Sequence, residues 1–399
     1  MNDTPNHSSL GASNAPQPTL VVGNLADPIR LKQVELNGVA AEAARGGEMV
    51  KVWTRLALTS DDPLFHRIVE GLSRVIAHRA ALAGAPLDIE RVKTLLLVIK
   101  PDQSAELWAD TAAVSVNVML KQSAATGQVI FEDDIVDVIG MGFPAIVIEK
   151  NDKVVCIFRQ DWRFGLFFDF NTSNDFNHSN FQRTLGSLYR SLKYRHIYDA
   201  LGQADVFERL VAAGWFPFAE ILTSEFKELL QHCEAGFEIN EIEERILPRF
   251  DEQRLVRMLD RWLAKPHFVS REAILRSAIQ SYLASNSVAV IKTVLTEIEG
   301  VLNSAHRATH GQGAKIPKLL EFAVTSAEQK AGEPHTLLLP QAFADYLTRR
   351  TFAHFDPVKG VGEAASRHAV GHGEAPASGY TQIAALQALL TLDQLAFCT

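Results

Sequence analysis

The spacing of apolar residues changes along the chain from a helical period to short strand-like runs, and then back to a helical period. From about residue 29 to 83, apolar positions recur every three or four residues, which predicts helix. The clearest series is Leu64, Ile68, Leu72, Val75 and Ile76. Short runs rich in β-branched and aromatic residues follow at 92–99, 145–149, 154–158 and 164–170. Because Gly, Pro and Asn separate these runs, they predict a small, mostly antiparallel sheet over residues 90–171.

Turn and breaker residues divide the chain further. The Asn151-Asp152 pair predicts a hairpin that joins 146–149 to 154–157. Beyond Phe176 the helical period continues almost to the last residue. Residues 1–20 are rich in Ser, Asn, Pro and Gly, which bury too little surface to offset the entropy lost on ordering. The predicted fold class is α+β, in five parts: a disordered tail (1–20), a helical lead (21–88), a small β-rich domain (89–175), a helical connector (176–264) and a C-terminal helical bundle (265–399).

Composition narrows the classes of protein to consider. The 399 residues are 47% hydrophobic, which is enough for two or three domains with a sizeable core. A net charge of −8 argues against a protein that coats nucleic acid, so any RNA contact is expected to be local. The three cysteines lie far apart without Cys-x-x-Cys spacing, which predicts neither disulfides nor a thiolate zinc site and favours the cytoplasm. Neither a membrane span nor a signal peptide is expected.

The segment Ser366-Arg367-His368-Ala369-Val370-Gly371-His372-Gly373 places an arginine and a histidine just before an apolar helix. Arginine is a permanently charged fork for phosphate and histidine titrates near neutral pH, so the pair suits cleavage of a phosphodiester without a metal. On an ideal helix, five positions separate Arg367 and His372 by about 140°. The two would converge if Gly371 and Gly373 interrupt the helix, or if a second subunit completes the site.

This run, followed by a leucine-rich helix, resembles the signature of HEPN-domain proteins: Arg, a polar residue, a few variable residues, then His and often Gly. The upstream segment 294–302 resembles the acidic "Ile-Glu-Gly" helix of some bacterial members, and 161–170 resembles the last strand of an accessory sheet domain. The helical part of the resemblance covers roughly residues 265–399. It implies a metal-independent endoribonuclease, a toxin or abortive-infection effector that leaves 2′,3′-cyclic phosphate ends.

The resemblance also implies residue roles. His372 would be the general base or acid, Arg367 would bind the scissile phosphate, and Glu297 or Glu299 would orient one of them. His368 occupies the polar position where Asn is frequent in the family. No cofactor is implied. The expected partners are RNA, a second copy in a homodimer and a neutralising antitoxin. The alternative is a non-catalytic HEPN-like protein that binds a nucleotide or RNA, or only supports oligomerisation.

Other features carry competing hypotheses. His368 and His372 have the i, i+4 spacing of metal ligands on a helix, although the adjacent glycines argue against that helix. Arg190, Lys193, Tyr194 and Arg195 form a basic, aromatic stretch that suits single-stranded RNA, with a solvated helix face as the alternative. Arg307 and His310 imitate the motif at a shorter spacing and are expected in a solvated linker. Since no phosphate-binding loop, dinucleotide fingerprint or nucleophile elbow occurs, ATPase, dehydrogenase and serine hydrolase activities lose their usual support.

Overall fold

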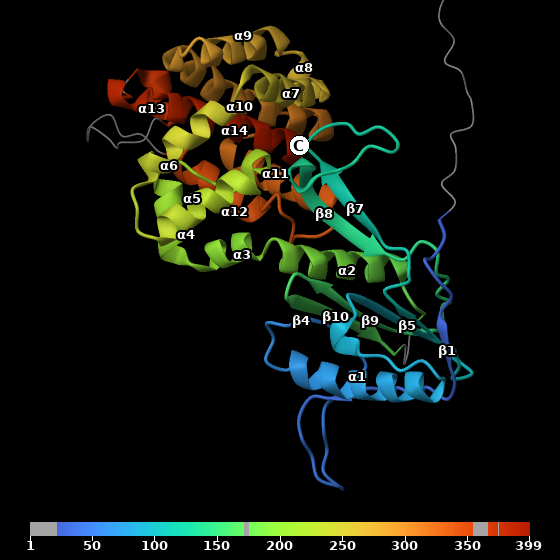
Figure 1. Cartoon of the computed structure of the whole chain (residues 1–399). Coiled ribbons are helices and arrows are strands. Elements are labelled where there is room, and N and C mark those ends of the chain that lie inside the picture. Colours follow the sequence, from blue (N-terminus) through green and yellow to red (C-terminus); the bar gives the residue numbers. More distant parts are fainter. Residues whose placement is uncertain (1–21, 171–174, 354–365, 374) are drawn as a thin grey trace, which may run out of the picture.

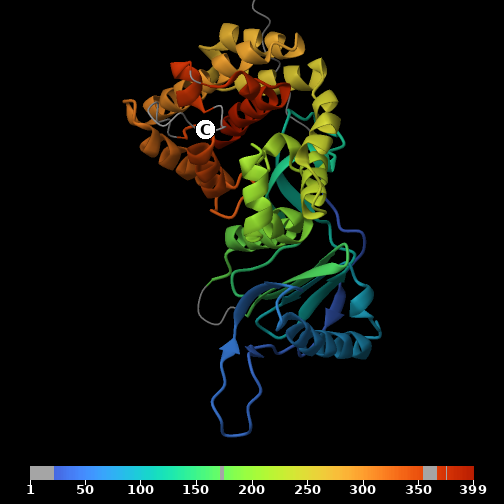
Figure 2. The ribbon, with the colours of Figure 1, turned by 90° about the vertical axis from the view of Figure 1, so that its left-hand side faces the viewer.

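The computed structural model describes residues 22–170, 175–353, 366–373 and 375–399. The predicted tail, residues 1–20, lies outside the described residues. The molecule is α+β, with a sheet domain at one end and a helical domain at the other (Figures 1 and 2).

The sheet domain is built on a six-stranded antiparallel sheet of order β1-β6-β5-β9-β10-β4. Helix α1 (Phe65–Leu82) covers one face, and α2 (His178–Lys193) lies along the other (Figure 1). The six strands are β1 (Ile29–Leu31), β4 (Arg55–Thr59), β5 (Thr94–Ile99), β6 (Ala105–Ala109), β9 (Lys153–Gln160) and β10 (Arg163–Asp169).

Both faces of this sheet are buried, which explains the continuous apolar run in β5. Leu95 and Leu97 pack in the core on the side of α1, whereas Leu96 and Val98 pack with the residues of α2. Successive side chains of a strand point to opposite faces, so a strand covered on both sides has no polar positions to alternate with.

Residues 29–59, which the spacing predicted as helix, form β1 to β4 instead. In β4, Leu56 and Leu58 pack on the core beneath α1, and Arg55 and Ala57, which alternate with them, are exposed. This period of two is short, and the longer helical series from Leu64 to Ile76 dominated the prediction for the region. The sheet therefore takes its outer strands, β1 and β4, from the predicted helical lead. Strands β2 (Val39–Ala40) and β3 (Val52–Trp53) form a short arm that projects from this domain (Figure 2).

The predicted hairpin around Asn151-Asp152 is wrong. Residues 146–149 form no strand, and β9 pairs with β5 on one side and β10 on the other. Asp152 is buried, and its side chain accepts hydrogen bonds from Glu149 N at 2.7 Å and Lys100 Nζ at 2.6 Å. Asp152 therefore closes a loop before β9, and the hairpin turn lies at Asp161, whose φ is +55°.

The helical domain contains α3 to α14, which share one hydrophobic core from Tyr194 to Cys398. Its helices are α3 (Arg195–Gly202), α4 (Ala204–Ala212), α5 (Ser224–Glu234), α6 (Ile239–Ile246), α7 (Glu252–Leu263), α8 (Pro266–Val269), α9 (Glu272–Leu283), α10 (Ser287–His310), α11 (Ile316–Ala331), α12 (Pro340–Arg349), α13 (Arg367–His372) and α14 (Gln382–Cys398). Every residue of α14 from Ala385 onward is buried, so this helix is the centre of the domain. The predicted connector beyond α2 and the predicted bundle thus share one core, while α2 packs on the sheet.

A two-stranded hairpin of β7 (Ser115–Leu120) and β8 (Ile135–Gly142) reaches from the sheet domain to the helical domain (Figure 1). Val136 and Val138 of β8 belong to the helical core. Helix α2 crosses β8 so closely that a Cβ on Gly186 would lie 2.5 Å from the Cα of Gly140. The hairpin and α2 together join the two domains.

Candidate functional site

The Arg/His segment forms the short helix α13. The side chain of Ser366 caps its start by accepting a hydrogen bond from Ala369 N at 3.2 Å, and Gly373 ends it with a φ of +76°. Ala369 and Val370 are buried. The helix is uninterrupted from Arg367 to His372, so the glycines do not bend the stretch between them.

Arg367 and Glu299 form an ion pair in which Nη2 of Arg367 lies 2.5 Å from Oε2 of Glu299. The Arg367 side chain is 30% exposed, and its Nε is buried. Of the two acids expected to support the motif, Glu299 therefore contacts Arg367. Glu297 pairs with Arg271 at 2.9 Å instead.

The structure also explains why the Ile-Glu-Gly segment has a glycine at position 300. A Cβ on Gly300 would lie 2.7 Å from Nη2 of Arg271. Glycine at this position lets the Arg271 guanidinium cross α10 and reach Glu297. The acidic helix thus presents two carboxylates, each held by a different arginine.

The two histidines of the motif are placed differently. His368 is half-buried, next to Arg367. His372 is the last residue of α13, about 140° around the helix from Arg367 by the helical period, and its side chain lies outside the described residues. Among the described residues, no group of three or more His, Cys, Asp or Glu side chains is arranged to hold a metal ion.

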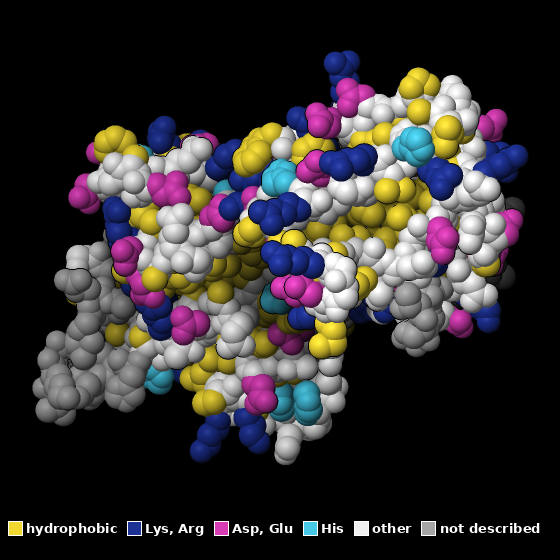
Figure 3. Space-filling view, turned by 90° about the horizontal axis from the view of Figure 1, so that it is seen from below, with side chains coloured by type: hydrophobic (Ala, Val, Ile, Leu, Met, Phe, Trp, Pro, Cys, Tyr) yellow, Lys and Arg dark blue, Asp and Glu magenta, His cyan; other side chains and the backbone are white. Residues whose placement is uncertain are grey.

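The predicted RNA-binding stretch is mostly taken up by contacts within the protein. Arg190 and Tyr194 are fully buried, so neither lies on the surface as the hypothesis required. Lys193 pairs with Glu132 at 3.0 Å, and Arg195 pairs with Asp199 at 3.0 Å and also with Asp61. On the face shown in Figure 3, Lys and Arg side chains are likewise interspersed with Asp and Glu rather than gathered in one basic surface.

Arg190 instead joins α2 to the β7–β8 hairpin and to the loop before α12. Its Nη1 donates to Val138 O at 2.6 Å and lies 3.5 Å from Oδ1 of Asp137, while Nη2 pairs with Glu333. Asp137 also accepts hydrogen bonds from Leu337 N, at 3.2 Å, and from the hydroxyl of Thr336. Burial raises the pKa of Asp137, although the charge of Arg190 opposes that shift.

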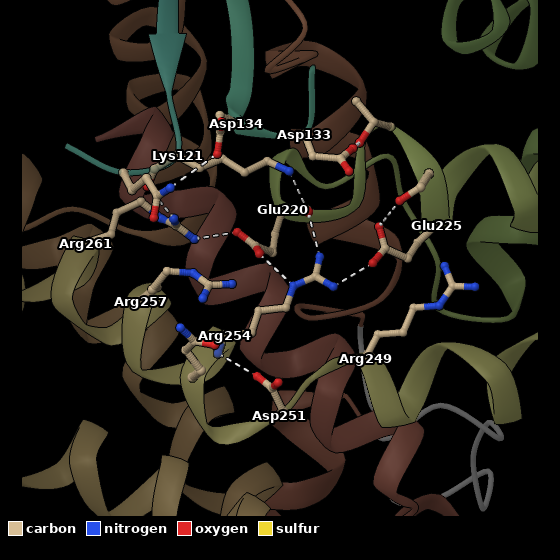
Figure 4. Close-up of a pocket in the computed structure, with 14 residues that line it drawn as sticks. Lys121, Asp133, Asp134, Glu220, Glu225, Arg249, Asp251, Arg254, Arg257 and Arg261 are labelled. Atoms are coloured by element: carbon tan, nitrogen blue, oxygen red, sulfur yellow. Dashed lines mark hydrogen bonds and ion pairs between the residues drawn. The ribbon is translucent and has the colours of Figure 1, made fainter. Parts of the chain in front are cut away.

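A charged pocket that the sequence analysis missed lies where the β7–β8 hairpin meets the helical domain (Figure 4). Its centre is Glu220, whose carboxylate accepts from Arg254 Nε and from Arg261 Nη2, each at 2.8 Å. Nη1 of Arg254 also lies 2.6 Å from Glu225, and Lys121 Nζ donates to the backbone oxygen of Glu220 at 2.8 Å. Arg261 continues the network to the buried Asp393 of α14, 2.7 Å away.

The charges of this pocket compensate one another. Burial opposes ionisation of Glu220, but the nearby charges of Lys121, Arg261 and Arg254 hold the pKa of this carboxyl below its ordinary value. Burial lowers the pKa of Lys121. The sequence signal was the spacing of Arg254, Arg257 and Arg261 along one face of α7, beside its buried apolar residues. Most of these cations already have acidic partners, so the network holds the hairpin to the helical domain.

No protein-family model, curated protein or solved structure matches this chain. In the part of the chain that the structure describes, no helix is long and apolar enough to cross a membrane.

Proposed function

We propose that this protein is a metal-independent endoribonuclease of the HEPN type, acting as a toxin or phage-defence effector. One observation carries the proposal: Arg367 and Glu299, from the two sequence segments that resemble this family, form an ion pair. The two segments, 294–302 and 366–373, are far apart in the sequence. The resemblance rests on residue types alone, so the contact between Glu299 and Arg367 is an independent observation. The Arg367 side chain, 30% exposed, is also accessible to a phosphate.

The chemistry follows from the donor set. A guanidinium has five N–H donors, so Arg367 retains free donors for phosphate oxygens while Glu299 fixes its orientation. His372 takes the proton of the ribose 2′-hydroxyl, and the 2′-oxygen attacks the phosphorus. The bond to the 5′-oxygen breaks, and that oxygen takes a proton from water while His372 releases its proton to solvent. The products are a 2′,3′-cyclic phosphate and a 5′-hydroxyl, and no metal takes part.

We propose that the active form is a homodimer in which two motifs face one cleft. Because α13 is a regular helix, positions 367 and 372 lie about 140° apart around it by the helical period. In the dimer, Arg367 of one copy and His372 of the other act on the same phosphate, so the helix does not need to bend.

The test is cleavage of total RNA in EDTA by the wild type, Arg367→Ala and His372→Ala. We expect cleavage by the wild type. The rate should be about 10²- to 10⁴-fold lower in His372→Ala, the usual contribution of general acid–base catalysis, and about 10²- to 10³-fold lower in Arg367→Ala, the usual cost of losing a donor to the developing negative charge. A mixture of the two inactive variants should regain activity, because one of its two shared sites keeps both residues. The matched control is Arg307→Ala with His310→Ala, an exposed Arg/His pair at a shorter spacing on α10 that should retain the wild-type rate.

Three outcomes would contradict parts of this proposal. Equal behaviour of all variants would exclude the motif as a nuclease site and favour a non-catalytic protein. Cleavage that disappears in EDTA would favour a metal held by His368 and His372. Mixed variants that stay inactive would contradict the shared site.

A further inference from the structure

A second groove lies beside the charged pocket, on the other side of a wall formed by Lys121, Gln122, Arg257 and Arg261. It has a volume of about 600 Å³ and runs between residues 119–123, at the end of β7, and helices α7, α11 and α14. We call it the hairpin groove. Volumes of roughly 300–1,000 Å³ are typical of small-molecule sites.

Basic side chains outnumber acidic ones in the lining of the hairpin groove. Arg257, Lys265 and Lys330 line it together with Lys121, while Asp260 is the one acidic residue of the lining. Within the described residues, no carboxylate lies in ion-pair distance of Arg257 or Lys265, in contrast to Arg254 and Arg261 in the neighbouring pocket. Like charges held together raise the free energy of the unliganded protein, and a bound anion would lower it.

The electrostatics at the far end of the groove agree with this arrangement. Lys330 Nζ donates to Phe397 O at 3.3 Å and to Thr399 O. Burial, with the positive charge of Lys265, lowers the pKa of Lys330 to about 8. An anion placed between Lys265 and Lys330 would relieve this repulsion.

The remaining wall of the groove is apolar and rigid. It is made by Met119, Leu120, Ala264, Ala396 and Phe397. The guanidinium of Arg261 lies over the Phe397 ring, 4.7 Å from its centroid, and is itself fixed by Glu220 and Asp393. Because these side chains are held by interactions inside the protein, the apolar wall is formed before any ligand arrives.

We propose that the hairpin groove binds an organic phosphate, with its phosphate group held by Arg257 and Lys265 and its apolar or aromatic body against Met119 and Phe397. Nothing in this assignment depends on the ribonuclease proposal, since α13 does not line the groove.

The probes are ADP, pyrophosphate and adenosine, each titrated calorimetrically into the full chain at low salt. We expect ADP to bind with a micromolar dissociation constant, and pyrophosphate and adenosine at least tenfold more weakly, because each lacks one half of the ligand. Arg257→Ala and Lys265→Ala should each weaken ADP binding about tenfold, the effect of losing one charge-assisted contact. The matched control is Lys318→Ala, an exposed lysine on α11 outside the groove, which should leave ADP affinity unchanged.

The outcomes separate the parts of the proposal. No binding of ADP or pyrophosphate below 1 mM, roughly −4 kcal/mol, would overturn it. Pyrophosphate binding as tight as ADP would overturn the role of the apolar wall. Equal losses in the Lys265 and Lys318 variants would show that the effect is not local to the groove. A short single-stranded RNA that binds more tightly than ADP and competes with it would overturn the assignment to a small molecule.

Discussion

At the scale of single residues, α10 carries two similar Glu–Arg ion pairs for which we expect different roles. Glu299 pairs with Arg367 of the proposed site, and Glu297 pairs with Arg271 at the start of α9. Both carboxylates are mostly covered, with side-chain exposures of 24% for Glu299 and 17% for Glu297. Substituting Glu297 therefore controls for the loss of stability that a substitution of Glu299 would cause.

We expect Glu299→Gln to lower the rate of RNA cleavage about tenfold, because Arg367 loses the carboxylate that orients it; this change equals about 1.4 kcal/mol of barrier. The measurement is kcat and KM with a short labelled RNA, together with urea unfolding of each variant. Glu297→Gln should lose comparable stability and retain the wild-type rate per folded molecule. Equal loss of rate in both variants would show that the carboxylates act through stability alone.

At the scale of elements, the packing of α2 on β8 depends on two glycines from different elements. A Cβ on Gly186 would meet Gly140 at three backbone atoms, at 2.5, 2.7 and 2.9 Å. Backbone atoms of a paired strand cannot move aside as a flexible side chain can. The close approach therefore explains a glycine in the middle of a helix, where it is otherwise unfavourable.

We expect Gly186→Ala to lower the free energy of unfolding by about 2 kcal/mol, since overpacking of roughly 1–3 kcal/mol outweighs the better helix propensity of Ala. Urea unfolding followed by circular dichroism measures it. The control is Gly71→Ala on α1, where a Cβ meets no atom within 4 Å and Ala should stabilise the protein slightly. A Gly186→Ala protein as stable as Gly71→Ala would contradict the close crossing.

At the scale of the whole molecule, Arg190 connects the two domains through buried charges. It lies on α2 and contacts Asp137 of the hairpin and Glu333 of the helical domain. Taking Arg190 away leaves Asp137 buried without its counter-charge, which is more costly than losing an exposed pair.

We expect Arg190→Met to lower the free energy of unfolding by about 3–5 kcal/mol, the usual cost of breaking a buried ion pair. Asp137→Asn in the same chain should restore part of this loss by removing the unpaired charge. The control is Arg183→Met, a partly exposed residue of α2 that donates a solvent-exposed hydrogen bond to Gly332 O, expected to cost at most about 1 kcal/mol. Equilibrium denaturation compares the four proteins, and equal stability of the Arg190 and Arg183 variants would show that the junction does not depend on the ion pair.

The spacing of residues was sufficient for part of the fold. Strands β5, β9 and β10 were predicted because their apolar, β-branched and aromatic residues are continuous and bounded by turns, and the α+β class is confirmed. Strand partners were not predictable, because pairing depends on residues far apart in sequence. Asp152 shows why the predicted hairpin is wrong: this turn residue hydrogen bonds to Lys100 on another segment instead of closing a local hairpin.

The sequence by itself determined the fold class and the segments that carry the Arg367 motif, since both are local patterns of residue type and spacing. The tertiary structure alone decided that Glu299, rather than Glu297, contacts Arg367. It also decided that Arg190 is buried and that Lys121 and Arg257 line the same groove. The physical reason is the same in each case: the free energy of a charged side chain depends on which distant segment packs against it, and local spacing does not specify that segment.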